Sequence, residues 1–237
     1  MSQYRFILDC DLDEKEIEIT EPRVVSQLGK VLRTKIGDKI FLSYGKTDKE
    51  AEAKIVKINK NSIKVKVLEV FEKKVEPEVN LTLFTSIIKK DRLEWLVEKA
   101  TEIGVTKIVP LVADRTVKLD FKKERLEKIA LEAAEQSGRT IVPEIWKKMT
   151  FKEALEETKN FEQNYFFSTE DSAKESLKIK DKNIKNISVF IGPEGDWSDE
   201  EIELAREYNL TFASLGKRIL RSETAGIVAA SLILLSK

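Results

Sequence analysis

The hydrophobic pattern of this 237-residue chain changes near residue 80, and that change constrains the fold more than any other feature. Before it, apolar and polar residues alternate over short segments separated by turn signals, at 16–19, 39–42, 53–58 and 62–67. One short helix is expected at residues 24–31. Several short strands with one small helix predict a compact β-barrel over residues 1–75, followed by a charged, proline-containing linker.

From residue 80 onwards, strand-like apolar runs alternate with amphipathic helical segments. Strands are expected at 81–85, 106–111, 163–168, 187–190 and 211–214, and helices at 91–103, 122–137, 151–158, 198–208 and 222–236. This alternation predicts a second domain over residues 76–237, built on a mostly parallel α/β sheet with both faces covered. Ligands on such sheets bind at the carboxyl ends of the strands.

Composition excludes several kinds of chemistry. The chain has no His and only one cysteine, Cys10, so it lacks a histidine-based nucleophile system, a Cys/His metal site and a disulfide. Acid–base work therefore falls to Glu, Asp, Lys, Tyr or a thiol. No apolar run approaches the roughly 20 residues of a membrane span. Residues 1–5 lack the apolar segment of a secretory signal, so a cytoplasmic protein is expected. The lack of a Cys/His cluster predicts that it uses no metal.

The 42 basic and 42 acidic residues balance overall but not locally. Residues 1–75 carry 16 Lys and Arg against 13 Asp and Glu, a net charge of +3, which leaves −3 for the rest of the chain. Two interpretations stay open: a chance fluctuation, or a mildly basic module that faces a polyanion.

Two segments late in the chain are candidates for a ligand site. IGPEG at 191–195 follows an apolar run and precedes a helix whose start is marked by a capping box, Ser198 with Glu201. A strand, a glycine-rich turn and a helix N-terminus place backbone N–H groups where a polar ligand can sit. The alternative is a tight turn in which glycine supplies a positive φ. LGKRILRSETA at 215–225 is a second turn of this kind, and together the two predict one site.

Four ordered blocks of the sequence resemble the small-subunit (16S) ribosomal RNA uridine N3-methyltransferases of the SPOUT superfamily. They are IGPEG with LGKRILRSETA, KKDRLEWLVEKATEIGV at 89–105, EQSGR with VP at 135–143, and LGKVLR with GD at 28–38. One departure stands out: the family usually reads Gly-Phe after GPEG, whereas this chain has Asp196-Trp197. The resemblance implies a PUA-like β-barrel followed by a trefoil-knotted α/β SPOUT methyltransferase domain, a rare exception to the no-knot rule.

The resemblance also implies a cofactor and partners. S-adenosyl-L-methionine would lie bent among three loops, the substrate would be 16S ribosomal RNA or the small ribosomal subunit, and the assembly would be a homodimer. The apolar stretch 227–235 at the end of the chain is the expected dimer contact. The implied cofactor-binding residues are Phe167, Ser168, Ile191, Gly192, Pro193, Glu194, Gly195, Leu215, Gly216, Ile219, Leu220, Thr224 and Ala225.

S-adenosylmethionine is a pre-activated methyl donor, so the transfer needs positioning and a deprotonated acceptor. Arg221 is the candidate for stabilising the uracil anion as it forms. Glu223 or Glu194 is the candidate for accepting the N3 proton, and for each of them a helix N-terminal or turn contact is the alternative role.

Contacts to RNA phosphates are expected from five basic residues, Arg5, Arg23, Lys30, Arg33 and Arg139. Two other functions stay open. One is a catalytically silent RNA-binding protein on the same scaffold, with Asp196 as the cause of lost cofactor affinity. The other is a methyltransferase that acts on tRNA.

Overall fold

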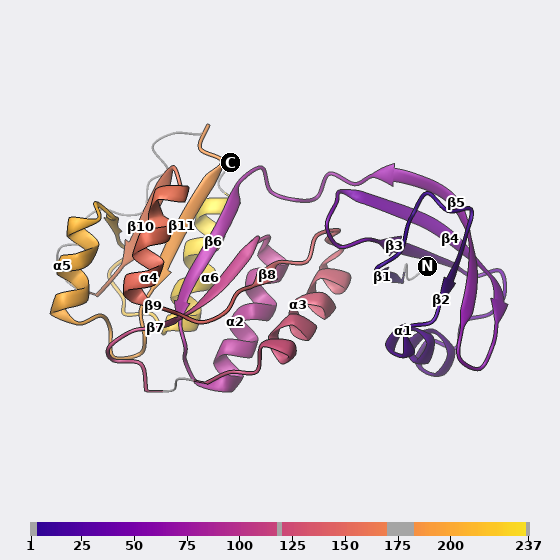
Figure 1. The fold of residues 1–237 in the computed structure, drawn as a ribbon, viewed down its shortest axis with the longest axis horizontal. Coiled ribbons are helices and arrows are strands. Elements are labelled where there is room, and N and C mark those ends of the chain that lie inside the picture. Colours follow the sequence, from indigo (N-terminus) through magenta and orange to yellow (C-terminus); the bar gives the residue numbers. More distant parts are fainter. Residues whose placement is uncertain (1–3, 118–119, 170–182, 236–237) are drawn as a thin grey trace. The chain divides into compact units, whose positions relative to one another are not determined.

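The computed structural model describes residues 4–117, 120–169 and 183–235, which divide into two compact units. The first unit holds the chain up to Glu76 together with a later segment, Ala134–Val142, and the second holds the other described residues (Figure 1). The expectation about a secretory signal includes residues 1–3, and the expected last helix includes residue 236. These four residues lie outside the described part of the chain. None of the helices in the described part of the chain is both long and apolar enough to cross a membrane.

The first unit is built on a five-stranded sheet in the order β1-β3-β4-β5-β2. Its elements are β1 (Arg5–Ile7), β2 (Glu16–Ile19), the helix α1 (Pro22–Ser26) with the π-helical turn that continues it (Gln27–Val31), β3 (Lys39–Ser43), β4 (Lys49–Ile58) and β5 (Ile63–Glu72). The four predicted strands and the short helix are confirmed. β1 is not among the predicted strands, because three residues are too few for an alternation to be detected.

This sheet is curved into a half-barrel, the form that the predicted compact barrel takes here. Among the described residues, the edge strands β1 and β2 do not pair with each other. Two register shifts between β4 and β5 mark irregular pairing of the kind that bends a sheet. The helical segment completes the core, since Val24 and Leu28 are fully buried in the same cluster as Ile40 and Leu42 of β3.

The second unit is built on a seven-stranded sheet in which every pairing is parallel. The strands follow the order β12-β10-β11-β6-β7-β8, and β9 also pairs with β7. They are β6 (Asn80–Ser86), β7 (Lys107–Val112), β8 (Glu144–Ile145), β9 (Met149–Thr150), β10 (Gln163–Phe167), β11 (Asn186–Ile191) and β12 (Thr211–Ala213). The predicted parallel sheet is confirmed, and the two-residue strands β8 and β9 are additions to it.

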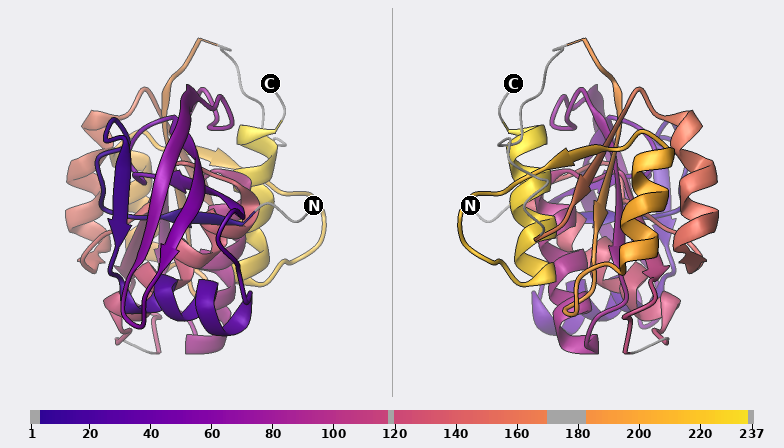
Figure 2. Two further views of the ribbon diagram at one scale, coloured as in Figure 1. Left: turned by 90° about the vertical axis from the view of Figure 1, so that its right-hand side faces the viewer. Right: turned by 90° about the vertical axis from the view of Figure 1, so that its left-hand side faces the viewer.

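Helices cover both faces of this sheet. They are α2 (Lys90–Ile103), α3 (Lys123–Ser137), α4 (Phe151–Glu156) with a 3₁₀ turn after it (Glu157–Asn160), α5 (Asp199–Glu207) and α6 (Ser222–Leu234). α6 packs against β6, β11 and α2, whereas α4 packs against β7. Figure 2 shows α4 and α6 on opposite sides of the strands. The five predicted helices are confirmed.

An aromatic core holds the strands that lead to the candidate site. The rings of Phe84 and Phe190, on the neighbouring strands β6 and β11, stack with their centroids 4.5 Å apart. Trp197 follows β11, is 1% exposed, and packs with its ring centroid 4.8 Å from those of both Phe151 and Phe166. This packing fixes where β10 and β11 end.

Candidate active site

A pocket of about 760 Å³ opens where β10, β11 and β12 end, in the size range of small-molecule sites. Three segments form most of its wall, and each begins with the last residue of a strand: residues 167–169 at the end of β10, 191–196 at the end of β11, and 213–222 at the end of β12. Arg92 and Ala225 complete it. This is the edge of the sheet at which the sequence predicts a ligand site. All the predicted cofactor-binding residues lie on this wall except Thr224.

The glycine-proline loop, residues 192–197, owes its first glycine to close packing. Neither Gly192 nor Gly195 has a positive φ, so the expected reason for glycine in a tight turn is wrong here. A Cβ on Gly192 would lie 2.9 Å from Nε1 and 3.0 Å from Cε2 of the buried Trp197. The indole is held in place because its Nε1 donates a hydrogen bond of 2.9 Å to the carbonyl of Phe167.

Asp196 is the loop residue with a left-handed backbone, at φ 58°. Its Oδ1 accepts a hydrogen bond of 2.9 Å from the amide of Trp197. Its Oδ2 accepts from the amide of Thr169 at 2.9 Å, from the hydroxyl of Ser168 at 3.3 Å, and from the hydroxyl of Thr169. The carboxylate therefore joins the glycine-proline loop to the segment that follows β10.

The predicted capping box at the start of α5 is confirmed. The amide of Glu201 donates to the hydroxyl of Ser198 at 3.3 Å, and the amide of Ser198 donates to Oε2 of Glu201 at 2.9 Å. Oε1 of Glu201 also accepts from the amide of Asp114 at 3.0 Å. Burial raises the pKa of Glu201. The box thus fixes the end of the glycine-proline loop against the chain that follows β7.

Arg92, in the first turn of α2, joins two of the three predicted catalytic residues. Its Nη1 lies 3.6 Å from Oε1 of Glu194, and its Nε lies 3.7 Å from Oε1 of Glu223. Glu223 is buried with its side chain 8% exposed, and its Oε2 accepts no hydrogen bond from the described residues. Glu223 does not line the pocket, whereas Glu194 and Arg92 do.

Sequence reasoning missed Arg92 as a site residue, although it lies in the KKDRLEW block that carries the family resemblance. The usable signal was its position at the start of the helix after β6. β6 pairs with β11, so the segments that follow the two strands leave the sheet at the same edge.

The third wall segment carries the predicted cation Arg221. The segment leaves β12, turns at Gly216 with φ 108°, and reaches α6 as an extended loop (Figure 2). Lys217, Arg218 and Arg221 line the pocket, and none of the three forms an ion pair with any residue that the structure describes. Ile219 on the same segment lines the pocket and is 84% exposed. One wall segment therefore carries three cations that have no carboxylate partner among the described residues.

Three of the five expected RNA contacts are ion-paired within the first unit. Arg5 pairs with Glu50 at 3.2 Å, Arg23 with Glu135 at 2.7 Å, and Arg139 with Glu76 at 2.6 Å. Arg139 is 5% exposed, so its guanidinium is not available to a phosphate. The other two, Lys30 and Arg33, are exposed.

A metal is not suggested by the arrangement of side chains. In residues 4–117, 120–169 and 183–235, no three His, Cys, Asp or Glu side chains are grouped as metal ligands would be. The pocket wall instead offers backbone groups, apolar side chains, Arg92 paired with Glu194, and a cationic loop.

Two family models match the chain: the RNA methyltransferase domain over residues 75–234 and the RNA methyltransferase PUA domain over residues 28–68. The ribosomal RNA small subunit methyltransferase E of Rickettsia conorii is 36% identical over 234 residues, which cover 97% of this chain and 94% of that protein. The chain belongs to this methyltransferase family.

The protein of the same name from Bacillus subtilis is 31% identical over 221 residues, covering 88% of this chain and 86% of its own. The crystal structure of the Neisseria gonorrhoeae family member, bound to S-adenosyl methionine, matches with a TM-score of 0.89 at 30% identity, over 99% of this chain and 98% of that one. The family resemblance and the fold class, a PUA-like unit followed by a methyltransferase unit, are confirmed. The chain is an RNA methyltransferase, and the silent RNA-binding alternative is not favoured.

Proposed function

We propose that this chain methylates N3 of a specific uridine in the 16S ribosomal RNA of the small ribosomal subunit, with S-adenosyl-L-methionine as methyl donor, in the cytoplasm. One observation carries the proposal: the pocket built from three strand ends lies in a chain that belongs to the ribosomal RNA small subunit methyltransferase E family. The relatives' names refer to ribosomal RNA, so we propose this substrate in place of tRNA.

The pocket wall fits this cofactor. Ile191, Leu215 and Leu220 supply apolar surface for a planar base, and the backbone of the glycine-proline loop supplies hydrogen-bonding groups beside it. When bound, the cofactor supplies a methyl group that is already activated by its positive sulfur, which needs no metal and no acid catalyst. The residues of the chain have only to position the two reactants and to manage the proton and the charge on the uracil ring.

The N3 proton has to leave as the N3–methyl bond forms, and we propose Glu194 as its acceptor. Glu194 lies on the pocket wall, whereas Glu223 is buried away from it. Arg92 between the two carboxylates holds Glu194 in place, and Glu223 positions Arg92. Glu194→Gln should lower the rate of methyl transfer by a factor on the order of 10²–10⁴, the usual contribution of a general base. Methylation at an unchanged rate in Glu194→Gln would exclude this role.

Removing the proton leaves negative charge on the uracil oxygens, and we propose that Arg221 stabilises it. Arg221 is exposed at the N-cap of α6, lines the pocket, and has no ion-pair partner among the described residues. Arg221→Ala should lower the methylation rate by a factor on the order of 10²–10³ while cofactor affinity is retained. The matched control is Arg125→Ala, an exposed arginine on α3 outside the pocket.

The measurement for Arg221 is transfer of labelled methyl to small subunits that lack the modification, followed by mass mapping of the modified nucleoside. Cofactor affinity is measured separately by calorimetry. Near-normal turnover of Arg221→Ala would remove the role, and a lost calorimetric signal would reassign Arg221 to cofactor binding. Methyl groups found on another nucleoside or another atom would refute the uridine N3 proposal itself.

The half-barrel would contribute RNA affinity through its exposed cations. Lys30 and Arg33 are exposed beside two exposed apolar side chains, Val31 at 71% and Ile36 at 66%. Each phosphate contact contributes roughly 0.7–0.9 to the slope of log affinity against log salt. The Lys30→Ala, Arg33→Ala double variant should therefore lower that slope by about 1.4–1.8. A salt slope equal to that of the wild type would show that these two cations do not touch RNA.

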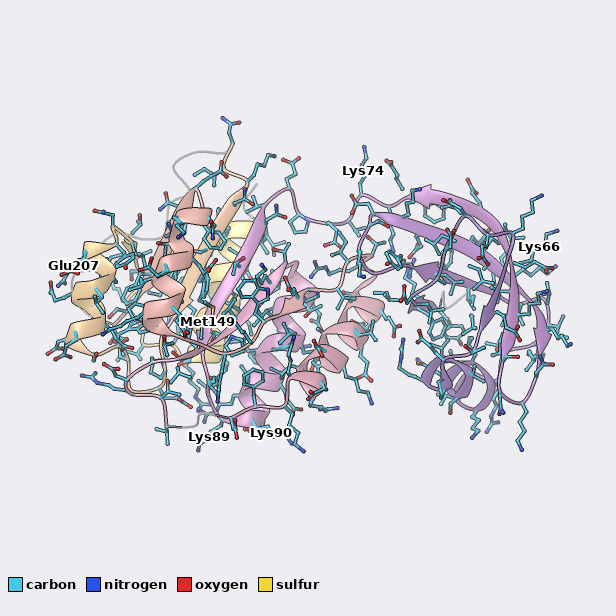
Figure 3. The ribbon with its side chains drawn as sticks, in the orientation of Figure 1. Lys66, Lys74, Lys89, Lys90, Met149 and Glu207 are labelled. Carbon is cyan, nitrogen blue, oxygen red and sulfur yellow. The ribbon has the colours of Figure 1, made fainter. Side chains whose placement is uncertain are left out.

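The control for the RNA experiment is Lys57→Ala with Lys66→Ala. Both lysines are exposed, and Lys66 projects from β5 in Figure 3. This variant removes the same number of charges from the same unit, so it separates contacts at one surface from bulk attraction.

We further propose that the protein is a homodimer that uses α6. One side of the helix packs within the second unit, with Ala229, Ala230 and Ile233 fully buried. Leu232 and Leu235 are nevertheless 45% and 69% exposed. Light scattering at micromolar concentration should give a dimer mass, and Leu232→Glu should shift it towards the monomer. A monomer mass for the unaltered protein would refute the assembly.

A further inference from the structure

The two segments that meet at Asp196 both belong to the wall of the pocket. Residues 167–169 are the last residue of β10 and the two that follow it, and residues 192–196 follow β11. Two neighbouring residues of the glycine-proline loop connect them. The buried indole of Trp197 donates to the carbonyl of Phe167, and the carboxylate of Asp196 accepts from the backbone and side chain of Thr169 and from Ser168.

The carboxylate suits this task because it accepts without donating. An ionised carboxylate offers about four lone-pair sites, and here four donors use them, one from its own loop and three from the segment after β10. Hydrogen bonds to a charged acceptor are stronger than neutral ones. A glycine at this position could form none of the three contacts to residues 168 and 169.

Asp196 also adopts a backbone conformation that residues other than glycine rarely adopt. At φ 58° it is in the left-handed region, which glycine occupies at no cost and aspartate occupies less readily. The surrounding contacts hold the residue there. Non-glycine residues in this region that are fixed by their surroundings cluster at ligand-binding sites, and this one lies on the pocket wall.

We propose that Asp196 is a positioning residue that latches the segment after β10 to the glycine-proline loop, so that the pocket wall is ordered before S-adenosylmethionine binds. This inference rests on the proposed function for the identity of the cofactor. A preorganised wall lowers the entropy lost on binding, so the latch raises cofactor affinity. It acts through the shape of the wall, and the rate of methyl transfer at saturating cofactor does not depend on it.

The departure at this position then has a role opposite to the one it has in the catalytically silent alternative. In that alternative, Asp196 is the cause of lost cofactor affinity in this chain. Its carboxylate is instead satisfied by donors of the adjoining wall segment, and it does not stand unpaired in the pocket.

The test compares three variants with the wild type. Asp196→Gly removes the carboxylate and accepts φ 58° without strain, so the path of the loop is retained. Asp196→Asn keeps the shape and replaces one acceptor by a donor, which places an amide opposite an N–H or hydroxyl. Asp199→Asn is the matched control, because Asp199 is an exposed acidic residue three positions away that does not line the pocket.

Calorimetry with S-adenosylmethionine and with S-adenosylhomocysteine, the product whose sulfur is neutral, separates two causes. If Asp196 acts as a latch, Asp196→Gly lowers the affinity for both ligands by about tenfold or more. The reason is that two to three hydrogen bonds to the carboxylate are lost, and other contacts replace them only in part. Asp196→Asn weakens both as well, and Asp199→Asn leaves both within twofold. If the charge of Asp196 simply attracts the positive sulfur, only S-adenosylmethionine loses affinity, and the latch is overturned.

A second measurement needs no ligand. Hydrogen exchange of the Thr169 amide, which donates to Asp196, should be faster in Asp196→Gly than in the wild type and unchanged in Asp199→Asn. Unchanged exchange or unchanged affinity for both ligands in Asp196→Gly overturns the latch while the proposed function stands. A wild-type protein that binds neither ligand overturns the proposed function, and with it the latch as a cofactor device.

Discussion

Replacing Gly192 by alanine tests whether the glycine-proline loop depends on close packing. The added Cβ would lie 2.9 Å from Nε1, 3.0 Å from Cε2 and 3.3 Å from Cδ1 of Trp197. Contacts below about 3.0 Å require the neighbour to move. The indole cannot move freely, because it is 1% exposed, lies between Phe151 and Phe166, and donates a hydrogen bond to the carbonyl of Phe167.

The expected cost follows from these contacts. Overpacking a well-packed core costs about 1–3 kcal/mol. Displacing the indole would also weaken a buried hydrogen bond, which adds about 1 kcal/mol. Gly192→Ala should therefore lower the free energy of unfolding by roughly 2–4 kcal/mol. At about 2–4 °C per kcal/mol, the melting temperature should fall by roughly 5–15 °C.

Tryptophan fluorescence reports the second unit by itself, because Trp95, Trp146 and Trp197 all lie in it. The matched control is Gly195→Ala in the same loop. Its Cβ would lie 3.3 Å from Cβ of Arg115, an exposed side chain, so we expect a loss below about 1 kcal/mol. A Gly192→Ala melting temperature within about 2 °C of the wild type would refute the packing argument. Such a small change would mean that the added Cβ fits beside the indole of Trp197 at almost no loss of stability.

Three further predictions concern charge and chemistry elsewhere in the chain. Glu76→Ala leaves the buried Arg139 without its carboxylate, so it should lower the free energy of unfolding by about 3–5 kcal/mol. A urea titration followed by circular dichroism measures this loss, and a value below about 1 kcal/mol would contradict the prediction. Burial, with Glu21 and Asp9 nearby, raises the pKa of the Cys10 thiol to about 11. At pH 8 roughly a thousandth of the thiol is then ionised, so alkylation by iodoacetamide should be slow. The alkylation rate should keep rising as the pH is raised towards 11. A rate that levels off near pH 9 would show an ordinary thiol. Methyl transfer should be unchanged after dialysis against a chelator, and activity restored only by added metal would refute the metal-free mechanism.

Much of the secondary structure could be predicted because it depends on residues close together in the sequence. The capping box of Ser198 and Glu201 spans three residues, and Gly104 ends α2 with φ 112°, so both are local signals. The alternation of strands and helices after residue 80 likewise predicts a parallel sheet, and with it the edge at which a ligand binds. Very short strands escape this reasoning, as β1 and β8 show.

The partners of the charged residues could not be predicted in this way. The basic residues Arg5, Arg23 and Arg139 have the composition of an RNA-binding surface, but each is paired with a carboxylate of the first unit. Glu135 lies 112 residues from Arg23 in sequence, and the segment that contains it and Arg139 belongs to the first unit although its pattern continues that of the second. Hydrophobic periodicity shows which residues face a core and carries no information on which distant charges meet.

In the candidate site too, some features follow from residues close together in the sequence and others from contacts between distant residues. The sequence by itself predicted that the two glycine-containing turns end strands of one parallel sheet, and the family resemblance named most of the residues that line the pocket. Only the tertiary structure decided that Arg92 lies between Glu194 and Glu223, that Gly192 is required by Trp197, and that Asp196 reaches Thr169. The physical reason is that these contacts join segments brought together by the order of the strands. That order is set by the packing of the whole unit and is not encoded within any one segment.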